Sequence, residues 1–277
     1  MPLYPKAECP VVIPYYGGKY ELSKKLIPLL LPHKRYFEPF FGGGSMFFRK
    51  KKAEWNVLND IDNDLVNLYI TVIEKFDELC QYIYWLPRGR FLHDEFRSDV
   101  KGNIVKNYPD VERAAKYFYI VRNAFNNRPL NTFSKDTYWK INILEELKMS
   151  REKLDGSTIE NFHFKDLIER YSPIREDDLF YFDPPYAITM EKKDYYRNVF
   201  SKEDHDELLN SCQYIDKSGG KFMISYDNVM YIKNLYEEYH INKIKTKYVG
   251  SNPDIRNKIK TELVITNYKP KKQEELF

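Results

Sequence analysis

The chain has 277 residues, of which 43% are hydrophobic and 31% charged, so it can bury one large core or a core that carries an insertion. It has no apolar run as long as a membrane span and no secretory signal pattern at its start, so we expect a soluble protein of the cytoplasm. Its three cysteines and five histidines lack CxxC and HExxH spacing, which disfavours disulfides and a metal site.

The net charge of +3 hides an uneven distribution of charged residues. Residues 101–140 hold eight Lys or Arg against three Asp or Glu, and residues 241–277 hold nine against four. Each of these stretches is therefore at +5, and the rest of the chain is at −7. Two basic stretches on an acidic body favour a polyanionic partner such as nucleic acid, and a solvated charged face is the alternative.

A glycine loop and a helix come first in the chain. Residues 15–19 read YYGGK, and leucines at helical spacing follow from Leu22 to Leu30. Lys19 then lies near the start of the helix, where a cation gains nothing from the helix dipole. The pattern indicates a lysine that holds a ligand carboxylate, with an ordinary surface lysine as the alternative.

Residues 35–51 predict a strand, a glycine turn and a helix, the order that opens a doubly wound sheet. The third glycine of a G-x-G-x-x-G fingerprint would fall on Phe47, which disfavours a pyrophosphate cofactor. A short strand over residues 57–60 then ends in Asp60, at the spacing where an acid binds ribose hydroxyls. Polar cap residues and apolar spacing over residues 61–69 predict the next helix.

Residues 71–165 predict mainly helices, over residues 76–86, 109–125 and 142–154, with a polar loop between the last two. This loop and the helix end before it combine cations and amides for phosphates and base edges with phenylalanines that can act as a wedge. An exposed polar loop is the alternative. The candidate DNA contacts are Arg122, Asn123, Phe125, Asn126, Asn127, Arg128 and Lys135, with Phe133 as a second candidate wedge.

Residues 179–186, LFYFDPPY, predict a buried strand that ends at Asp183. Pro184 and Pro185 remove two backbone donors, so the ladder of the sheet stops there. A carboxylate beside a free carbonyl can accept both hydrogens of one planar amino group, and Tyr186 offers a stacking face. The segment therefore indicates a site for the exocyclic amine of a nucleobase, with a proline-rich turn as the alternative.

The last third of the chain predicts a helix capped by Ser201 and three strands, over residues 219–226, 240–250 and 261–269. A loop before the helix could close over an extruded base; the family resemblance described below implies Phe200 as an apolar wall, with core packing of Phe200 as the alternative. The polar loop between the last two strands offers Asn252, Arg256 and Lys258 to the DNA backbone.

Four motifs in order, YYGGK, FEPFFGGGS, NDIDNDL and YFDPPY, resemble the DNA adenine methylase (Dam) family of S-adenosylmethionine-dependent N6-adenine DNA methyltransferases. The matching segments cover roughly the first 70 and the last 110 residues. The resemblance implies an α/β fold with a doubly wound, Rossmann-like methyltransferase sheet made by residues 1–70 and 166–277. It also implies a mainly helical target-recognition domain inserted at residues 71–165.

The resemblance implies a role for each matching residue. The cofactor-binding set would be Tyr15, Lys19, Glu38, Phe40, Gly42, Gly44, Asp60 and Asp183, with Lys19 at the methionine end and Asp60 on the ribose. The catalytic set would be Asp183, Pro184, Pro185 and Tyr186, which hold the target base. Tyr15 departs from close relatives, which often have tryptophan there.

The predicted reaction is methyl transfer from S-adenosylmethionine to N6 of an adenine flipped out of double-stranded DNA, without a metal. The alternatives are RNA adenine or N4-cytosine methylation, methylation of protein glutamine, and a noncatalytic DNA-binding protein. Family members that read GATC carry an Asn-Gly step followed by leucine and arginine, whereas this chain has FNNRPLN from Phe125. We therefore expect the protein to recognise a DNA sequence other than GATC. A partner restriction endonuclease is compatible with the sequence, and so is an enzyme that acts without one.

Overall fold

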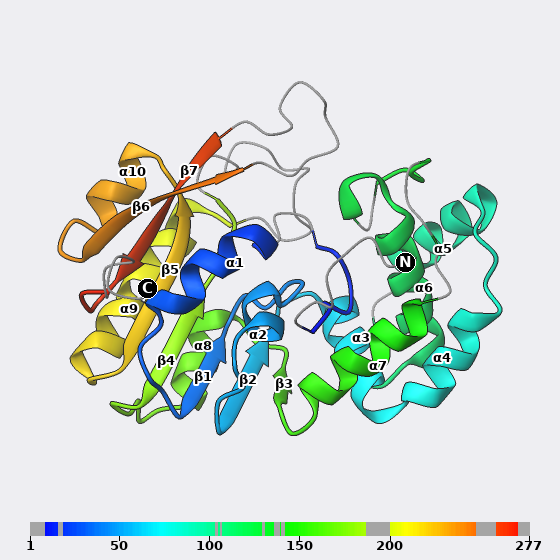
Figure 1. Cartoon of the computed structure of the whole chain (residues 1–277), viewed down its shortest axis with the longest axis horizontal. Coiled ribbons are helices and arrows are strands. Elements are labelled where there is room, and N and C mark those ends of the chain that lie inside the picture. Colours follow the sequence, from blue (N-terminus) through cyan, green and yellow to red (C-terminus); the bar gives the residue numbers. More distant parts are fainter. Residues whose placement is uncertain are drawn as a thin grey trace. The chain divides into compact units, whose positions relative to one another are not determined.

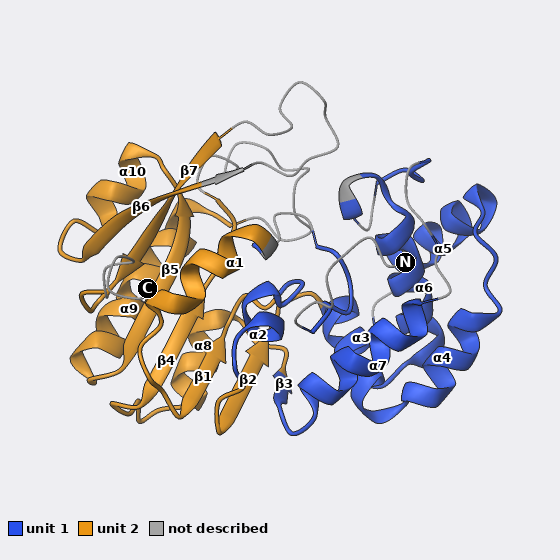
Figure 2. Cartoon of the chain, viewed as in Figure 1, with its two compact units in different colours: residues 1–19, 42–51, 63–159 blue, residues 20–41, 52–62, 160–277 orange. Residues whose placement is uncertain are grey.

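The computed structural model describes residues 9–15, 19–102, 105, 107–128, 131–135, 139, 142–186, 200–247 and 259–270. The chain divides into two compact units, shown in Figure 2. Unit 1 comprises residues 1–19, 42–51 and 63–159, and unit 2 comprises residues 20–41, 52–62 and 160–277. Within the described ranges, every helix is too short or too polar to cross a membrane.

The sheet has seven strands in the order β3-β2-β1-β4-β5-β7-β6 (Figure 1). Strands β2, β1, β4 and β5 run parallel, whereas β7 is antiparallel to both β5 and β6. The expected α/β class is therefore confirmed, with a mixed sheet. The strands are β1 (Arg35–Glu38), β2 (Trp55–Asn59), β3 (Thr158–Glu160), β4 (Asp178–Phe182), β5 (Lys221–Asp227), β6 (His240–Lys247) and β7 (Ile259–Thr266).

The central strands form because they are apolar enough to be covered on both faces. Every residue of β1 and of β4 is buried, as expected for the middle of a parallel sheet. The rings of Phe37 and Phe180, which are register partners, stack with centroids 4.3 Å apart. Arg35 holds Asp178, its own register partner, in a buried two-pronged ion pair, which fixes the pairing of β1 with β4.

Unit 2 covers this sheet with helices α1 (Tyr20–Leu26), α8 (Phe164–Arg170), α9 (Lys202–Lys217) and α10 (Met230–Leu235). The predicted cap of α9 is confirmed: Ser201 accepts from the backbone of Asp204, whose carboxylate accepts in turn from the Ser201 N–H. Apolar side chains of α8 and α9 join those of β1, β4 and β5 in one core.

Unit 1 is helical, with α2 (Ser45–Arg49), α3 (Asn63–Glu74), α4 (Phe76–Tyr84), α5 (Arg90–Gly102), α6 (Val111–Asn123) and α7 (Ile143–Leu154). Helix α5 was not predicted from the sequence. It buries His93, Phe96 and Val100, so one of the three interior positions of its stripe is a histidine and the apolar periodicity is weak.

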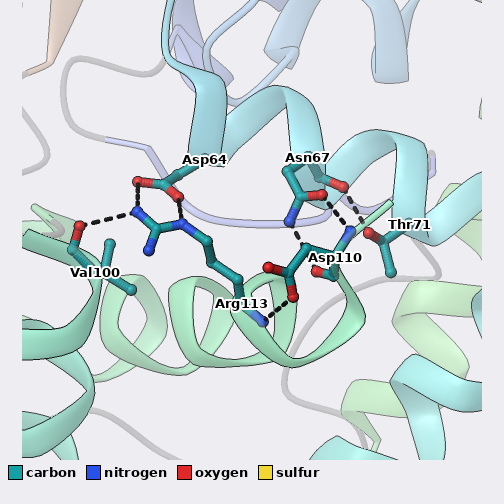
Figure 3. A network of polar contacts seen from close by, with 6 residues as sticks. All are labelled: Asp64, Asn67, Thr71, Val100, Asp110 and Arg113. Carbon is teal, nitrogen blue, oxygen red and sulfur yellow. Dashed lines mark hydrogen bonds and ion pairs between the residues drawn. The ribbon is translucent and has the colours of Figure 1, made fainter. Parts of the chain in front are cut away.

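A polar network joins α3 to the start of α6, as Figure 3 shows. The Arg113 guanidinium donates to both carboxylate oxygens of Asp64, at 2.5 and 3.2 Å, and to the Val100 carbonyl at 3.0 Å. Asn67 exchanges hydrogen bonds of 2.8 and 2.9 Å with the backbone of Asp110, and the Asp110 carboxylate caps α6. The buried Asp64–Arg113 ion pair and the hydrogen bonds around it therefore fix the position of α3 relative to the start of α6.

Candidate active site

The carboxyl ends of the parallel strands lie at one edge of the sheet and carry acidic side chains. Glu38 ends β1, Asp60 follows β2, Asp183 follows β4 and Asp227 ends β5. Ligands of open α/β sheets bind beyond this edge, where the strand order reverses. Unit 2 therefore presents a carboxylate-rich edge at the place where the motifs predict a ligand site.

Asp183 is held from the neighbouring strand. The Ser225 hydroxyl, on β5, lies 3.0 Å from Asp183 Oδ1, and the Tyr181 hydroxyl lies 2.8 Å from the same Ser225 oxygen. Both hydroxyl-bearing residues are buried. The register of β4 with β5, in which Phe182 pairs with Ile224, brings these side chains together.

Tyr186 is oriented by two residues of β7. Its hydroxyl donates to Glu262 Oε2 at 2.7 Å, and the Lys260 ammonium lies 4.2 Å from the centre of its ring. Lys260 also pairs with Glu262 at 3.4 Å. Burial, and then the charge of Glu262, raise the pKa of Tyr186 well above its ordinary value, so the phenol stays a hydrogen-bond donor.

Glu38 and Asp60 are fixed by local hydrogen bonds. The Tyr36 hydroxyl donates to Glu38 at 2.8 Å, and the Asp62 backbone N–H donates to the Asp60 carboxylate at 2.9 Å. Two asparagines that the sequence did not single out as site residues support this corner. Asn59 donates to the carbonyls of Pro39 and Phe162, at 2.9 and 3.0 Å, and Asn161 donates to the Asp60 carbonyl at 2.8 Å.

Phe40 and Phe200 come together at the margin of the core of unit 2. Their ring centroids are 5.7 Å apart, and Phe164 packs against both. Phe200 also meets the buried His205 edge-on at 4.7 Å. Burial lowers the pKa of His205 to about 4, so this imidazole is neutral at pH 7. Core packing of Phe200 is observed, and its role as a wall for a base stays a prediction.

Within unit 1, Tyr15 lies against the glycine turn. A Cβ on Gly42 would come within 3.2 Å of the Tyr15 ring, and one on Gly43 within 2.8 Å of the Tyr15 Cβ. Gly42 and Gly44 have φ of 48° and 65°, which side chains rarely adopt. Glycine is therefore required here by contact and by conformation. Lys19 is only 7% exposed, which is unlike an ordinary surface lysine.

The predicted DNA loop forms a hairpin in unit 1, called the 123–134 hairpin, whose described residues are 123–128 and 131–134. The Ser134 N–H donates to the Asn123 carbonyl at 2.7 Å, and the Phe125 N–H donates to the Thr132 carbonyl at 2.8 Å. Phe125 is 45% exposed and Lys135 is exposed, so both can reach a partner.

Arg88, which sequence reasoning did not single out, closes the base of this hairpin. It donates to the Ser134 carbonyl at 2.6 Å and to Asn123 Oδ1 at 3.2 Å, and its guanidinium lies 4.5 Å from the centre of the Phe133 ring. Asn123 is fully buried and also donates to the Tyr119 carbonyl at 2.9 Å.

Arg122 also takes part in contacts inside unit 1. It pairs with Glu146 at 3.2 Å and donates to the Val12 carbonyl at 3.1 Å. These contacts of Arg122, Asn123 and Phe133 lie inside unit 1, and the role of the three residues in DNA binding stays a prediction. The side chain of Asn126 and the residues Asn252, Arg256 and Lys258 lie outside the described residues.

One cluster in unit 2 has the residue types of a metal site. His163, Asp204 and Glu207 each bring one ligand atom within 4.8 Å of the others. Asp204 already takes part in the cap of α9, and Glu207 pairs with Lys165 at 2.9 Å. These acids thus have structural partners, and the cluster carries no argument for a metal ion.

A mixed sheet whose parallel strands end in carboxylates, with Asp-Pro-Pro-Tyr after the central strand β4, has the architecture of α/β enzymes, a class that binds its ligands at that edge. The family described as D12 class N6 adenine-specific DNA methyltransferase matches residues 15–249, and the chain belongs to it. The expected activity, methylation of N6 of adenine in DNA, is thereby confirmed, and the protein is an adenine-specific DNA methyltransferase.

Its relatives include proteins named type II methyltransferases and proteins named DNA adenine methylases. The type II methyltransferase M1.LlaDCHI of Lactococcus lactis is 28% identical, over 91% of this chain and 93% of the relative. The type II methyltransferase M.MjaIII of Methanocaldococcus jannaschii is 28% identical, over 91% and 96%. The DNA adenine methylase of Escherichia coli K12 is 25% identical, over 92% and 93%.

Proposed function

We propose that the protein transfers a methyl group from S-adenosylmethionine to N6 of an adenine that has been flipped out of duplex DNA. The observation that carries the proposal is the placement of Asp183, whose carboxylate is held at the carboxyl end of β4 directly before Pro184. Because Pro185 has no N–H, the chain cannot continue the parallel ladder. The Asp183 carboxylate and the Pro184 carbonyl are then the acceptors for the two amino hydrogens.

In this mechanism the protein positions and polarises the amino group. S-adenosylmethionine would supply an electrophilic methyl group, whose bond to sulfur breaks as the neutral thioether S-adenosylhomocysteine leaves. As Asp183 and Pro184 draw the two amino hydrogens, the N6 lone pair leaves conjugation with the ring and points along the line of attack. The carboxylate of Asp183 then holds the proton that N6 loses when the new N–C bond forms. Tyr186 supplies a stacking surface for the base, and the expulsion of the base costs a few kcal/mol that these contacts offset.

The residues present fit the proposed cofactor. S-adenosylmethionine carries a sulfonium and an ammonium, so the carboxylate-rich strand edge of unit 2 suits it. Carboxylates also accept hydrogen bonds from ribose hydroxyls, which is the role proposed for Asp60. The same proposal assigns cofactor binding, by the resemblance, to Glu38 and Phe40 of unit 2 and to Tyr15, Lys19, Gly42 and Gly44 of unit 1. The burial of Lys19 and the contact of Tyr15 with the glycine turn support their inclusion.

The proposal also assigns target recognition to the helical segment, residues 71–165. The hairpin 123–134 would contact DNA through Phe125, Asn127, Arg128 and the adjacent Lys135. This assignment is supported by the exposure of Phe125 and Lys135 and by the local excess of basic residues.

The test is the Asp183→Ala variant, assayed on duplex DNA with labelled S-adenosylmethionine. Turnover should fall by about 10² or more, because one of two amino acceptors is lost, while calorimetry shows that DNA and cofactor still bind. Asp216→Ala, in the last turn of α9, is the matched control and should keep full turnover. An Asp183→Ala enzyme with more than about a tenth of wild-type turnover would contradict the mechanism.

A further inference from the structure

Two buried hydroxyl groups, of Ser225 and Tyr181, are linked to Asp183 by consecutive hydrogen bonds. Ser225 is fully buried and Tyr181 is 1% exposed. Successive side chains of a strand point to opposite faces of the sheet, so the two hydroxyls lie on the face opposite Phe180, Phe182 and Ile224, which belong to the apolar core. The charges of Asp183, Glu38 and Glu262 act on Tyr181.

The direction of the hydrogen bonds follows from chemistry. An ionised carboxylate can only accept, so the Ser225 hydroxyl donates to Asp183 Oδ1 across 3.0 Å. The single proton of Ser225 is then used, and its oxygen accepts from the Tyr181 hydroxyl across 2.8 Å. Burial, together with the charge of Asp183, raises the pKa of Tyr181 well above its ordinary value. Tyr181 therefore keeps the proton that it donates.

We propose that Tyr181 and Ser225 are positioning residues that fix the rotation of the Asp183 carboxylate through a two-step hydrogen-bond relay. The proposal rests on the proposed role of Asp183 as an acceptor for the adenine amino group. A carboxylate turns about its last bond, whereas the amino group needs an acceptor within a few tenths of an ångström of one place. A charge-assisted bond from a strand-held serine removes that freedom, and the tyrosine removes the freedom of the serine.

The experiment compares Ser225→Ala, Tyr181→Phe and the double variant on duplex DNA. Turnover is measured per mole of protein that binds cofactor in calorimetry. In Ser225→Ala and in the double variant, kcat should fall by about tenfold to a hundredfold. The KM for DNA and the Kd for cofactor should stay within about twofold, since neither hydroxyl touches a substrate. Tyr181→Phe should lower kcat in the wild-type background and have no further effect in the Ser225→Ala background.

The double variant controls for a loss of activity that is caused by unfolding. Ser225→Ala alone leaves the Tyr181 hydroxyl without its acceptor and so lowers stability, whereas the double variant removes both polar groups together. Tyr236→Phe, which alters a fully buried tyrosine at the end of α10, is the matched control and should keep wild-type kcat.

The outcomes separate the relay from the proposed function. Wild-type kcat in the double variant, with Asp183→Ala inactive, would overturn the relay alone. Additive losses from Tyr181→Phe and Ser225→Ala would also overturn it, because the tyrosine would then act by another route. Substantial turnover by Asp183→Ala would overturn the proposed function, and the relay with it.

Discussion

Tyr186 shows how single side chains prepare this site for a flat ligand. Glu262 fixes the phenol end of the ring, and Lys260 lies over one of the two ring faces. A cation over an aromatic face is itself stabilising, so the ring does not depend on a base for its orientation. In the proposed complex an adenine stacks on the face opposite Lys260. The ordering of Tyr186 is thus complete before the base arrives, which lowers the entropy cost of binding.

His205 couples the stability of unit 2 to pH. Its imidazole is buried, contacts the Tyr226 hydroxyl and packs against Phe200. Burial lowers its folded-state pKa from 6.5 to about 4, although Asp204 and Asp206 act in the opposite direction. As the pH falls, the unfolded chain therefore takes up the proton first. The free energy of unfolding is therefore not reduced by His205 above about pH 6.5, and it decreases progressively as the pH falls toward 4.

We expect the free energy of unfolding to fall by up to about 3 kcal/mol between pH 7 and pH 4 on account of this residue. Urea denaturation of the wild type and of His205→Gln measures it, because the variant cannot titrate there. The difference in unfolding free energy between the two proteins should shift in favour of the variant as the pH falls. A difference that stays constant from pH 7 to pH 4 would show that His205 is not the group responsible.

At the scale of elements, the 123–134 hairpin depends on a residue outside it. Its strands are short and include one isolated bridge, between Ala124 and Phe133. So small a hairpin is marginal alone in water. Arg88 stabilises the hairpin, since it donates hydrogen bonds to both arms of the hairpin and stacks on Phe133. Tyr119 fixes the segment around Arg88 in turn, through bonds to Pro87 and Gly89.

Arg88→Lys should reduce discrimination between the target word and words with one changed base pair, by about fivefold or more. Lysine keeps the charge but cannot make two directed bonds and stack at once. If Arg88 only attracted phosphates, lysine would preserve discrimination. Arg90→Lys is the matched control: Arg90 lies 5.5 Å from the Phe133 ring and, among described residues, makes no hydrogen bond to the hairpin. Methylation rates on a panel of duplexes measure both variants, and equal discrimination by Arg88→Lys and wild type would contradict the prediction.

At the scale of the whole molecule, the elements with a clear apolar period could be predicted from the sequence. Strands β1, β4 and β5 have short apolar runs bounded by glycine, proline or acids, and α9 has its serine cap. Helix α5 and strand β3 could not be predicted this way. The interior stripe of α5 includes a histidine, and β3 has only three half-buried residues.

Side-chain contacts between distant residues left no mark in the sequence. Tyr181 and Ser225 are 44 residues apart, and Arg88 lies 35 residues from Asn123. Neither pair belongs to a periodic pattern, so only the fold shows that the residues meet. Arg122 and Asn123 show the converse limit, because residue types that suit DNA also suit the interior when a partner satisfies them, and their role in DNA binding stays a prediction. The motif residues Asp60 and Asp183 lie at strand ends as expected, because the end of a strand is determined by residues that are adjacent in the sequence.

The hairpin also supports a prediction about the DNA word. Family members that read GATC carry, by the resemblance drawn from sequence, an Asn-Gly step, whereas this chain has Asn126-Asn127. Asn127 adopts a φ of 54°, in the left-handed region that glycine favours and asparagine tolerates, so the turn survives without glycine. What differs is the order that follows, since Arg128 precedes Pro129 and Leu130, two residues outside the described ranges.

An arginine at this earlier position would meet a base edge from a different point along the groove. A bidentate arginine to guanine contributes about 1–3 kcal/mol of discrimination, so its displacement should change the word that is read, beyond weakening the binding. We therefore expect adenine methylation outside strict GATC in DNA from cells that express the protein, measured by methylation-sensitive sequencing. Arg128→Ala should alter the sequence preference, whereas Lys135→Ala, which removes a charge beside the hairpin, should weaken binding to all words alike. A methylome confined to GATC, or an Arg128→Ala enzyme with the preference of the wild type, would refute this assignment.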